Sequence, residues 1–418
     1  MRPRISSLAL GGVLGLALVA CSGDPAGSSG ADATDAAAGD ATGDGHGAVA
    51  GAAEVSEPQL GLTTIDPAGA VTHLDLLDES VSDLGSVGAP SALTTDGRYL
   101  FAQTDAGVEV VDSGVWTWDH VDHFHYYRAD PALLGTVEGD GDATVATTNL
   151  STTGGTGLFF PDSGEAVLLD TEALSEGEIS EQFRVEVDPH AGLVVPVGSF
   201  ALVTEATDGV AASVVARGAD GEPTGLEEPC VRASGTITTR VGAVIGCADG
   251  ALLAHVEDEE LVVERIPYPA GTTAPPATTF ANREGRPTVA ALAGDAGEAG
   301  IWLLDTRERA WTLLPAPEPL VAVSAVDDAD QHVLALTATG RVLVLSGEDG
   351  AVLAATEPLA AASLAAGVRP TLVADQQRAY LSAPLEQRLH EIDFADAARV
   401  ARTFETTTEP AFTAETGR

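Results

Sequence analysis

The sequence predicts an all-β protein that folds as a β-propeller of seven blades, with eight blades as the alternative. Short apolar runs rich in β-branched residues, such as residues 108–111 and 342–345, are separated by Gly, Asp and Pro. Such runs are typical of β-strands. They recur every 42 to 53 residues, and a repeat of about 40 to 50 residues with four strands is typical of propeller blades. Only residues 359–367 favour a helix, and that stretch is brief and rich in Ala.

Seven repeats can be traced, and several share one internal order: a strand, a turn, a second strand, then Gly and a third strand ending near Asp. Radial closure of such repeats hides the strand edges. Further strands within residues 60–77 either complete the last blade or belong to an eighth, and we favour seven. A pair of β-sandwiches is the structural alternative, which the regular spacing disfavours. The repeats begin near Ser91, Thr144, His190, Thr236, Thr278, Val321 and Pro370.

The first 20 residues have the features of a bacterial lipoprotein signal peptide. Arg2 and Arg4 precede an apolar stretch, residues 5–20, that is short for a membrane span and suits a signal peptide. The stretch ends in LVAC, which resembles a lipobox, so we expect lipidation of Cys21. The protein is then extracytoplasmic and anchored to the outer face of the cell membrane. An ordinary cleaved signal, with Cys21 there by chance, is the alternative.

Residues 21–57 are predicted to be the lipidated cysteine and a flexible acidic linker, followed by the propeller at residues 58–418. The linker contains seven acidic residues, no Arg or Lys and no aromatic residue. Such a composition cannot bury enough apolar surface to offset the entropy of ordering the chain. A flexible segment of this length reaches about 30–35 Å.

The chain is strongly acidic, with a net charge of −43, and all 20 of its basic residues are Arg. Nucleic acid and anionic lipid surfaces require a basic patch, so this composition disfavours both as partners. The sequence also lacks a Gly-x-Ser-x-Gly motif, a phosphate loop and a metalloprotease helix. We therefore expect a monomer without enzymatic activity.

Two further cysteines, Cys230 and Cys247, form an even pair in a chain that we expect in an oxidising compartment. A disulfide is the default interpretation, and it would stabilise the fold by roughly 3 kcal/mol. A metal site with two thiolates is the alternative, but no His lies close to the pair in the sequence.

One stretch, residues 116–128 with the sequence WTWDHVDHFHYYR, concentrates residues that bind metals. On an extended strand, His123 and His125 lie on one face, with Cβ atoms about 7 Å apart. His120 has the opposite parity and joins them only if the chain bends. Asp122 could act as a ligand or accept an imidazole N–H. The set predicts a zinc site, with copper or nickel as alternatives. The competing interpretation is a solvated polar loop.

This run resembles the AztD family of zinc metallochaperones. So do PALLGTVEG, which starts at Pro131, the segment GLFF, and the EPC and GCADG segments that contain Cys230 and Cys247. The resemblance spans most of residues 90–260. It implies a periplasmic β-propeller that passes zinc to the substrate-binding protein of a zinc ABC transporter. It also implies that His120, His123 and His125 bind Zn²⁺.

The family tends to carry a His before a Gly-hydrophobic-Val-Pro strand, and here His190 has that place in DPHAGLVVP. The resemblance thus makes His190 a candidate further ligand, with a capping role at the strand start as the alternative. Two departures are evident: family members have a His-rich N-terminus, where this chain has only His46, and Cys21 provides an anchor. We interpret His73, His255, His332 and His390 as structural or surface residues.

Three functions remain open at this point. The first is a zinc chaperone that serves a zinc ABC transporter. The second is a metal-free binding or scaffold propeller at the cell surface. The third is a propeller hydrolase with a catalytic metal, for which the sequence offers neither a distinct base nor a nucleophile.

Overall fold

The computed structural model describes residues 47–119, 123–294 and 300–418, whose regular structure is almost entirely β-strand. The helices in these ranges are α1 (Thr171–Ser175) and α2 (Ala361–Ala365), and α2 lies in the stretch predicted to be helical. The chain divides into two compact units, residues 1–42 and 43–418, and every described residue belongs to the second. Within the described ranges, no helix has the length and apolar character needed to span a membrane. The all-β prediction is confirmed.

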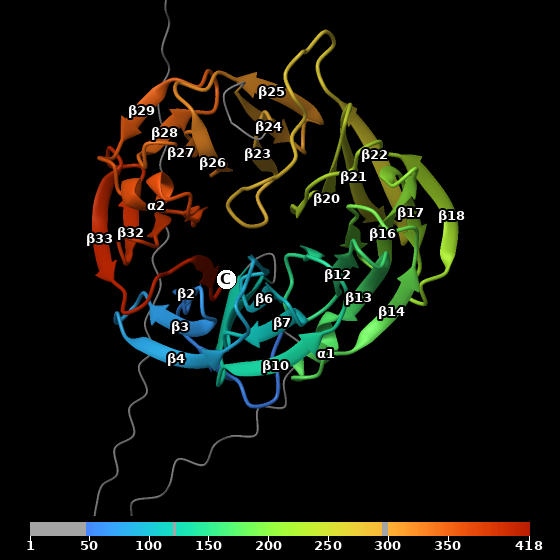
Figure 1. Ribbon diagram of the computed structural model, residues 1–418, viewed down its shortest axis with the longest axis horizontal. Helices are drawn as coiled ribbons and strands as arrows, with labels where there is room; N and C mark the ends of the chain where they lie inside the picture. Colours follow the sequence, from blue (N-terminus) through green and yellow to red (C-terminus); the bar gives the residue numbers. More distant parts are fainter. Residues whose placement is uncertain (1–46, 120–122, 295–299) are drawn as a thin grey trace, which may run out of the picture. The chain divides into compact units, whose positions relative to one another are not determined.

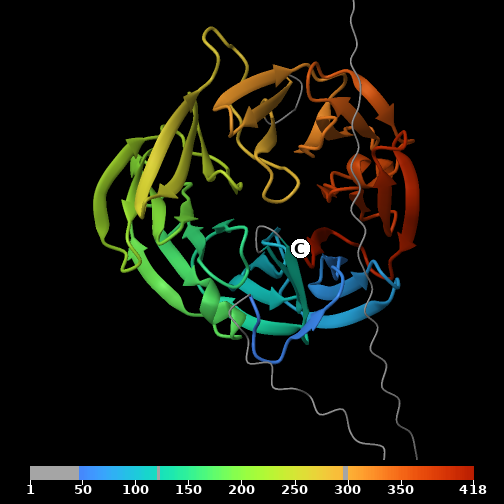
Figure 2. The ribbon, with the colours of Figure 1, turned by 180° about the vertical axis from the view of Figure 1, so that it is seen from behind.

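Eight antiparallel sheets follow one another around a ring, which confirms the β-propeller (Figure 1; Figure 2 from behind). We number the sheets as blades one to eight in chain order, with the inner strand of each given first. Blade one contains β34 (Phe412–Thr416), β2 (Gly61–Ile65), β3 (Ala70–Asp75) and β4 (Val81–Ser86). Blade two contains β5 (Ala92–Thr95), β6 (Tyr99–Thr104), β7 (Gly107–Asp112) and β10 (Ala132–Val137). Blade three contains β11 (Thr144–Ala146), β12 (Gly155–Phe160), β13 (Glu165–Asp170) and β14 (Glu181–Glu186). Blade four contains β15 (Val194–Val197), β16 (Phe200–Thr207), β17 (Val210–Arg217) and β18 (Pro223–Pro229).

The second half of the ring repeats the arrangement. Blade five contains β19 (Thr236–Thr238), β20 (Ala243–Cys247), β21 (Gly250–Glu257) and β22 (Glu260–Pro267). Blade six contains β23 (Thr288–Leu292), β24 (Ile301–Asp305) and β25 (Ala310–Leu314). Blade seven contains β26 (Leu320–Ala325), β27 (His332–Thr337), β28 (Val342–Ser346) and β29 (Val352–Ala355). Blade eight contains β30 (Leu372–Ala374), β31 (Ala379–Ala383), β32 (Arg388–Asp393) and β33 (Arg399–Glu405).

Blade one joins the two ends of the propeller. Its inner strand, β34, is the last strand of the chain and pairs with β2 from Gly61↔Thr416 to Ile65↔Phe412. The strands near residues 60–77 therefore belong to an additional blade that the C-terminus completes. The ring has eight blades, which was the alternative count, and not the favoured seven. Pairing with β34 covers the inner edge of β2, and β34 becomes the inner edge strand of the blade.

The apolar core lies between adjacent blades. It is built from side chains that point alternately to the two faces of each strand. On β12, Phe160 packs with Tyr99 and Phe101 of blade two, while the preceding residue, Phe159, packs with Val194 and other residues of blade four. Successive side chains of a strand point to opposite faces, so both faces of an inner blade strand are buried. Full burial of each such side chain contributes about 1.5–3 kcal/mol.

Blade six has an irregular inner edge. Residues 277–281 take the place of an inner strand through isolated bridges, Ala277↔Ala293 and Ala281↔Ala290. The chain then passes through Glu284 before β23 begins at Thr288. This segment brings polar side chains towards the axis of the ring.

Cys230 and Cys247 form a disulfide, as predicted. Cys230 follows the outer strand of blade four and Cys247 ends β20 of blade five, so the bond joins neighbouring blades. Both side chains are buried in the apolar cluster between these blades. With both sulfurs in the disulfide, no thiolate remains for the alternative metal site.

Three strands lie outside the eight blades and form a small sheet of their own, in the order β1 (Ala53–Val55), β9 (Phe124–Arg128) and β8 (Val115–Asp119). β1 falls within residues 21–57, the range predicted to be a flexible linker. Strand pairing thus starts before residue 58, because the open edge of β9 offers hydrogen-bonding groups to any passing backbone. Cys21, the signal peptide and His46 lie outside the described residues.

Candidate metal centre

The candidate centre lies on the β8–β9 hairpin, which replaces a simple turn between β7 and β10 of blade two. In the blades whose four strands follow one another in the sequence, the first–second and third–fourth strand connections emerge on one face because neighbouring strands are antiparallel. The hairpin is a third–fourth connection, and we call this side the hairpin face. Its strands pair from Val115↔Arg128 to Asp119↔Phe124. Two predicted ligands, His120 and Asp122, come between these strands in the sequence and lie outside the described residues.

The base of the hairpin is fixed by an aromatic stack. Trp116 is buried, and its ring stacks on Tyr127 with centroids 5.3 Å apart. The Trp116 Nε1 donates to the carbonyl oxygen of Gly47 at 3.1 Å. The Arg98 guanidinium lies 3.8 Å from the centre of the Trp116 ring and is paired with Asp112. The apolar and cationic contacts together hold the strand that leads to the histidines.

Further along the hairpin, contacts reach other parts of the ring. The amide of Thr117 donates to the backbone oxygen of Arg418, and its hydroxyl donates to the carbonyl oxygen of Gly417, both at 2.8 Å. Asp119 Oδ2 lies 3.1 Å from the Nη2 of Arg240, which belongs to blade five. The hairpin is therefore supported by the C-terminus and by a distant blade, as a precise binding site requires.

The hairpin brings His123 and His125 together. Their Nε2 atoms are 2.9 Å apart and their ring centroids 4.7 Å apart. The Nδ1 of His125 lies 2.7 Å from Oε1 of Glu54 on β1. His123 is exposed, whereas the side chain of His125 is only 17% exposed. The two-residue spacing thus places both rings on one side of β9, as strand geometry requires.

This donor set fits a zinc ion. Two nitrogen ligands at 2.0–2.1 Å from a tetrahedral zinc are about 3.3 Å apart, close to the separation of the two Nε2 atoms. A metal-bound imidazole usually donates its other N–H to a carboxylate or carbonyl, and Glu54 stands in that position for His125. The rings of Trp118 and Tyr127, 6.0 Å and 6.3 Å from that of His125, lower the polarity around it.

Sequence reasoning missed Glu54. It lies 71 positions before His125 and inside the segment interpreted as linker. A lone Glu in a Gly- and Ala-rich stretch gives no signal of its own. Only the pairing of Glu54 with Tyr127 in the β1–β9 ladder places its carboxylate beside His125.

The structure does not bring His190 to this pair. His190 lies in the connection from β14 to β15, which is a blade-to-blade connection and emerges opposite the hairpin face. It is buried, with Nδ1 2.6 Å from the carbonyl oxygen of Asp188 and Nε2 2.8 Å from the hydroxyl of Thr204. Since Nδ1 must donate to the carbonyl, Nε2 accepts the Thr204 proton. The geometry fits the alternative interpretation, a capping role at the strand start.

A second group able to hold a metal lies in the turn before β27. Asp328, Asp330 and His332 offer ligand atoms within 4.8 Å of one another. The Nδ1 of His332 is 2.6 Å from Oδ2 of Asp328. Neighbouring Asp327 is paired with the guanidinium groups of Arg286 and Arg307, which add positive charge nearby. The Asp-x-Asp-x-His spacing is the sequence signal for this group, whereas His332 taken alone is predicted to be a structural or surface residue.

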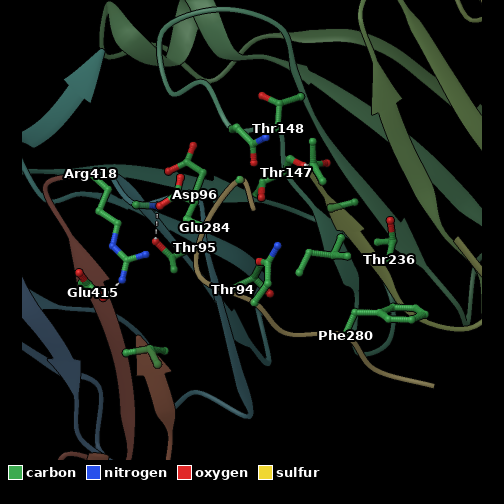
Figure 3. A pocket seen from close by; sticks show the side chains of 18 of the residues that line it. Thr94, Thr95, Asp96, Thr147, Thr148, Thr236, Phe280, Glu284, Glu415 and Arg418 are labelled. Carbon is green, nitrogen blue, oxygen red and sulfur yellow. Dashed lines mark hydrogen bonds and ion pairs between the residues drawn. The ribbon is translucent and has the colours of Figure 1, made fainter. Parts of the chain in front are cut away.

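A polar cavity of about 270 Å³ is lined by residues of several inner strands and their turns (Figure 3). Asp96 at its wall accepts the backbone N–H groups of Arg98 and Tyr99, and burial raises the pKa of Asp96 to about 7. Burial also raises the pKa of Glu284, against the opposing charge of Arg418. The cavity gathers these acids from blades far apart in the sequence, so no local motif marks it.

Arg418 connects the cavity to the hairpin. Its guanidinium pairs with Glu415 in the cavity wall, and its backbone oxygen accepts the amide of Thr117. Burial lowers the pKa of Arg418, while Glu284 opposes this effect. The C-terminus, marked C in Figure 1, lies near the centre of the ring. The last residue therefore ties the hairpin to the acidic cavity wall.

No family model matches the sequence. Among solved structures, the chain is similar to AztD from Citrobacter koseri, with a TM-score of 0.72 and 20% identity over 87% of this chain and 99% of that one. The chain has the fold of AztD. The apo form of the same Citrobacter protein matches with the same values. BamB from Moraxella catarrhalis matches with a TM-score of 0.45 and 12% identity, over 86% of this chain and 90% of that one. The resemblance to AztD found in the sequence is thus confirmed at the level of the fold.

Proposed function

We propose that the protein is an extracytoplasmic zinc-binding metallochaperone, with His123 and His125 at the centre of its zinc site. The observation that carries the proposal is the pair of Nε2 atoms 2.9 Å apart, with Nδ1 of His125 held by a carboxylate. Neutral imidazole nitrogens are preferred zinc ligands, and the outer carboxylate raises their basicity. His120 and Asp122, which precede the pair in the sequence, would supply the remaining ligands.

The position of the pair favours a carrier over a catalyst. Handing over a metal ion requires that ligands of the acceptor reach it, and exposed His123, immediately before β9, meets that need. We propose no catalytic role for the site. We assign the role of acceptor to the substrate-binding protein of a zinc ABC transporter, as the resemblance to AztD implies, and we propose that the carrier is a monomer.

The proposed location follows from Cys21 and agrees with the disulfide. Disulfides persist in oxidising compartments, so the Cys230–Cys247 bond is expected outside the cytoplasm. We propose that Cys21 is lipidated and anchors the chain to the outer face of the cell membrane. A tether with a reach of about 30–35 Å would keep the carrier close to a membrane-bound acceptor.

Metal analysis of the purified chain tests the proposal. We expect one tightly bound Zn²⁺ per chain, and its loss in the double variant His123→Ala/His125→Ala. The matched control, Asp328→Ala/His332→Ala, removes the second group of potential ligands and should keep the zinc. Unchanged zinc content in the first variant contradicts the proposal. A chain that binds no zinc at all supports the alternative function, a metal-free scaffold at the cell surface.

A further inference from the structure

The segment before the propeller is paired with the strand that carries His125. In the β1–β9 ladder, Ala53 pairs with Arg128, Glu54 with Tyr127 and Val55 with Tyr126. The side chains of residues two apart on a strand share a face, so Glu54 stands on the same face of the small sheet as Tyr127 and His125. The contact between Glu54 and His125 is therefore a product of the ladder register.

The chemistry of this contact sets the tautomer of His125. An ionised carboxylate can only accept, so Nδ1 of His125 carries the proton that it donates to Glu54 over 2.7 Å. The lone pair of the neutral ring is then on Nε2, the atom that faces Nε2 of His123. Without Glu54, the other tautomer would become more populated, and its Nε2 would carry a proton in place of the lone pair.

β1 and the residues before it are held on the hairpin mainly through their backbone. Its side chains are mostly exposed, including 58% of that of Glu54, so few apolar contacts hold it down. Ahead of β1, the carbonyl oxygen of Gly47 accepts Nε1 of Trp116 at the base of the hairpin. A short, exposed strand of this kind opens locally at low free-energy cost.

We propose that Glu54 is a positioning residue for His125, so that docking of β1 on the hairpin and zinc binding at His123 and His125 stabilise each other. This inference rests on the proposed function. Coupling between two binding events is reciprocal: if docked β1 strengthens zinc binding, zinc strengthens docking by the same factor. Binding of zinc would then hold β1, which precedes the propeller, on the hairpin, and loss of zinc would release it. An acceptor that displaces β1 would weaken the hold on the ion.

Zinc affinity of the full chain provides the first test. Removal of an outer carboxylate typically lowers metal affinity 10- to 100-fold, and we expect a loss of about this size for Glu54→Ala. Glu54→Gln keeps an acceptor for Nδ1 without the charge, so it should recover part of the affinity. Glu57→Ala is the matched control: it removes the same charge from the same segment, beyond β1, and should leave the affinity unchanged.

Hydrogen exchange of the β1 backbone provides the second test, since a merely structural role of Glu54 would not respond to zinc. In the unmodified chain, zinc should slow the exchange of residues 53–55. This slowing should disappear in Glu54→Ala and in His123→Ala/His125→Ala.

The outcomes separate the two proposals. If the unmodified chain binds no zinc, the proposed function and this inference both fail. If zinc binds and depends on His123 and His125, but Glu54→Ala binds it as tightly as Glu57→Ala does, only the inference is overturned. Zinc-independent exchange at residues 53–55 in a chain that binds zinc also overturns it.

Discussion

The β8–β9 hairpin and the connection from β14 to β15 both hold a histidine whose Nδ1 meets an oxygen acceptor. For His125 the acceptor is the Glu54 carboxylate, and for His190 it is the Asp188 carbonyl. The difference lies at the other nitrogen. The Nε2 of His125 faces a second imidazole at a partly exposed site, whereas that of His190 faces the Thr204 hydroxyl inside the core. The partner of the second nitrogen distinguishes a potential ligand from a structural histidine.

The largest effect that we expect from this comparison is on zinc affinity. His125→Ala removes a proposed ligand and should weaken zinc binding by more than the roughly 10- to 100-fold that loss of an outer partner causes. His190→Ala should leave the affinity unchanged, because both of its nitrogens are engaged on the opposite face. Competition with a fluorescent zinc chelator measures both. Weaker binding in the folded His190→Ala variant would contradict the assignment of His190 as a structural histidine.

The second effect concerns stability, where we expect His190→Ala to be more harmful than His125→Ala. His190→Ala removes one partner of the Thr204 hydroxyl, which still accepts the amide of Leu193, and the side-chain partner of the Asp188 carbonyl, and it removes an edge contact with Phe159. Loss of a buried polar partner should lower the free energy of unfolding by about 1–3 kcal/mol. His125→Ala, at a partly exposed position and without zinc, should change it by no more than about 0.5 kcal/mol. Denaturant unfolding in the presence of a chelator measures both values.

The smallest effect concerns protonation of other buried histidines of the blades. Burial lowers the pKa of His73 and of His390 below the ordinary value of 6.5. The neutral ring is thus favoured in the folded state, and its contribution to stability is present above pH 6.5 and lost as the pH falls towards the folded-state pKa. NMR titration should find both rings neutral at pH 6.5. A midpoint of titration at or above pH 6.5 for either ring would contradict the expected effect of burial.

Most of the fold could be predicted because each blade carries its own signal. For example, Phe159 and Phe160 point into two different inter-blade cores, and this alternation can be recognised from neighbouring residues alone. The number of blades could not be predicted in this way. The pairing of β34 with β2 joins residues more than 340 positions apart, and the strands of blade one are distinguished from an unfinished last blade only by that closure.

The residues of the candidate site also differ in whether a local sequence signal predicts them. The spacing of His123 and His125 places both on one side of a strand, because side chains alternate with a period of two. The resemblance to AztD suggested His190 as well, but the connection that carries it emerges on the opposite face of the ring. Glu54 had no local signal, since its role depends on a strand pairing across the chain.

By itself, the sequence determined the all-β repeats, the disulfide pair and the proximity of two histidines, since each depends on residues close together in the chain and on local strand geometry. The tertiary structure decided the eighth blade, the separation of His190 from the pair and the contact of Glu54 with His125. These depend on which strand edges meet. Strand edges pair through backbone groups common to all residues, so no local side-chain pattern identifies the partner of a given edge.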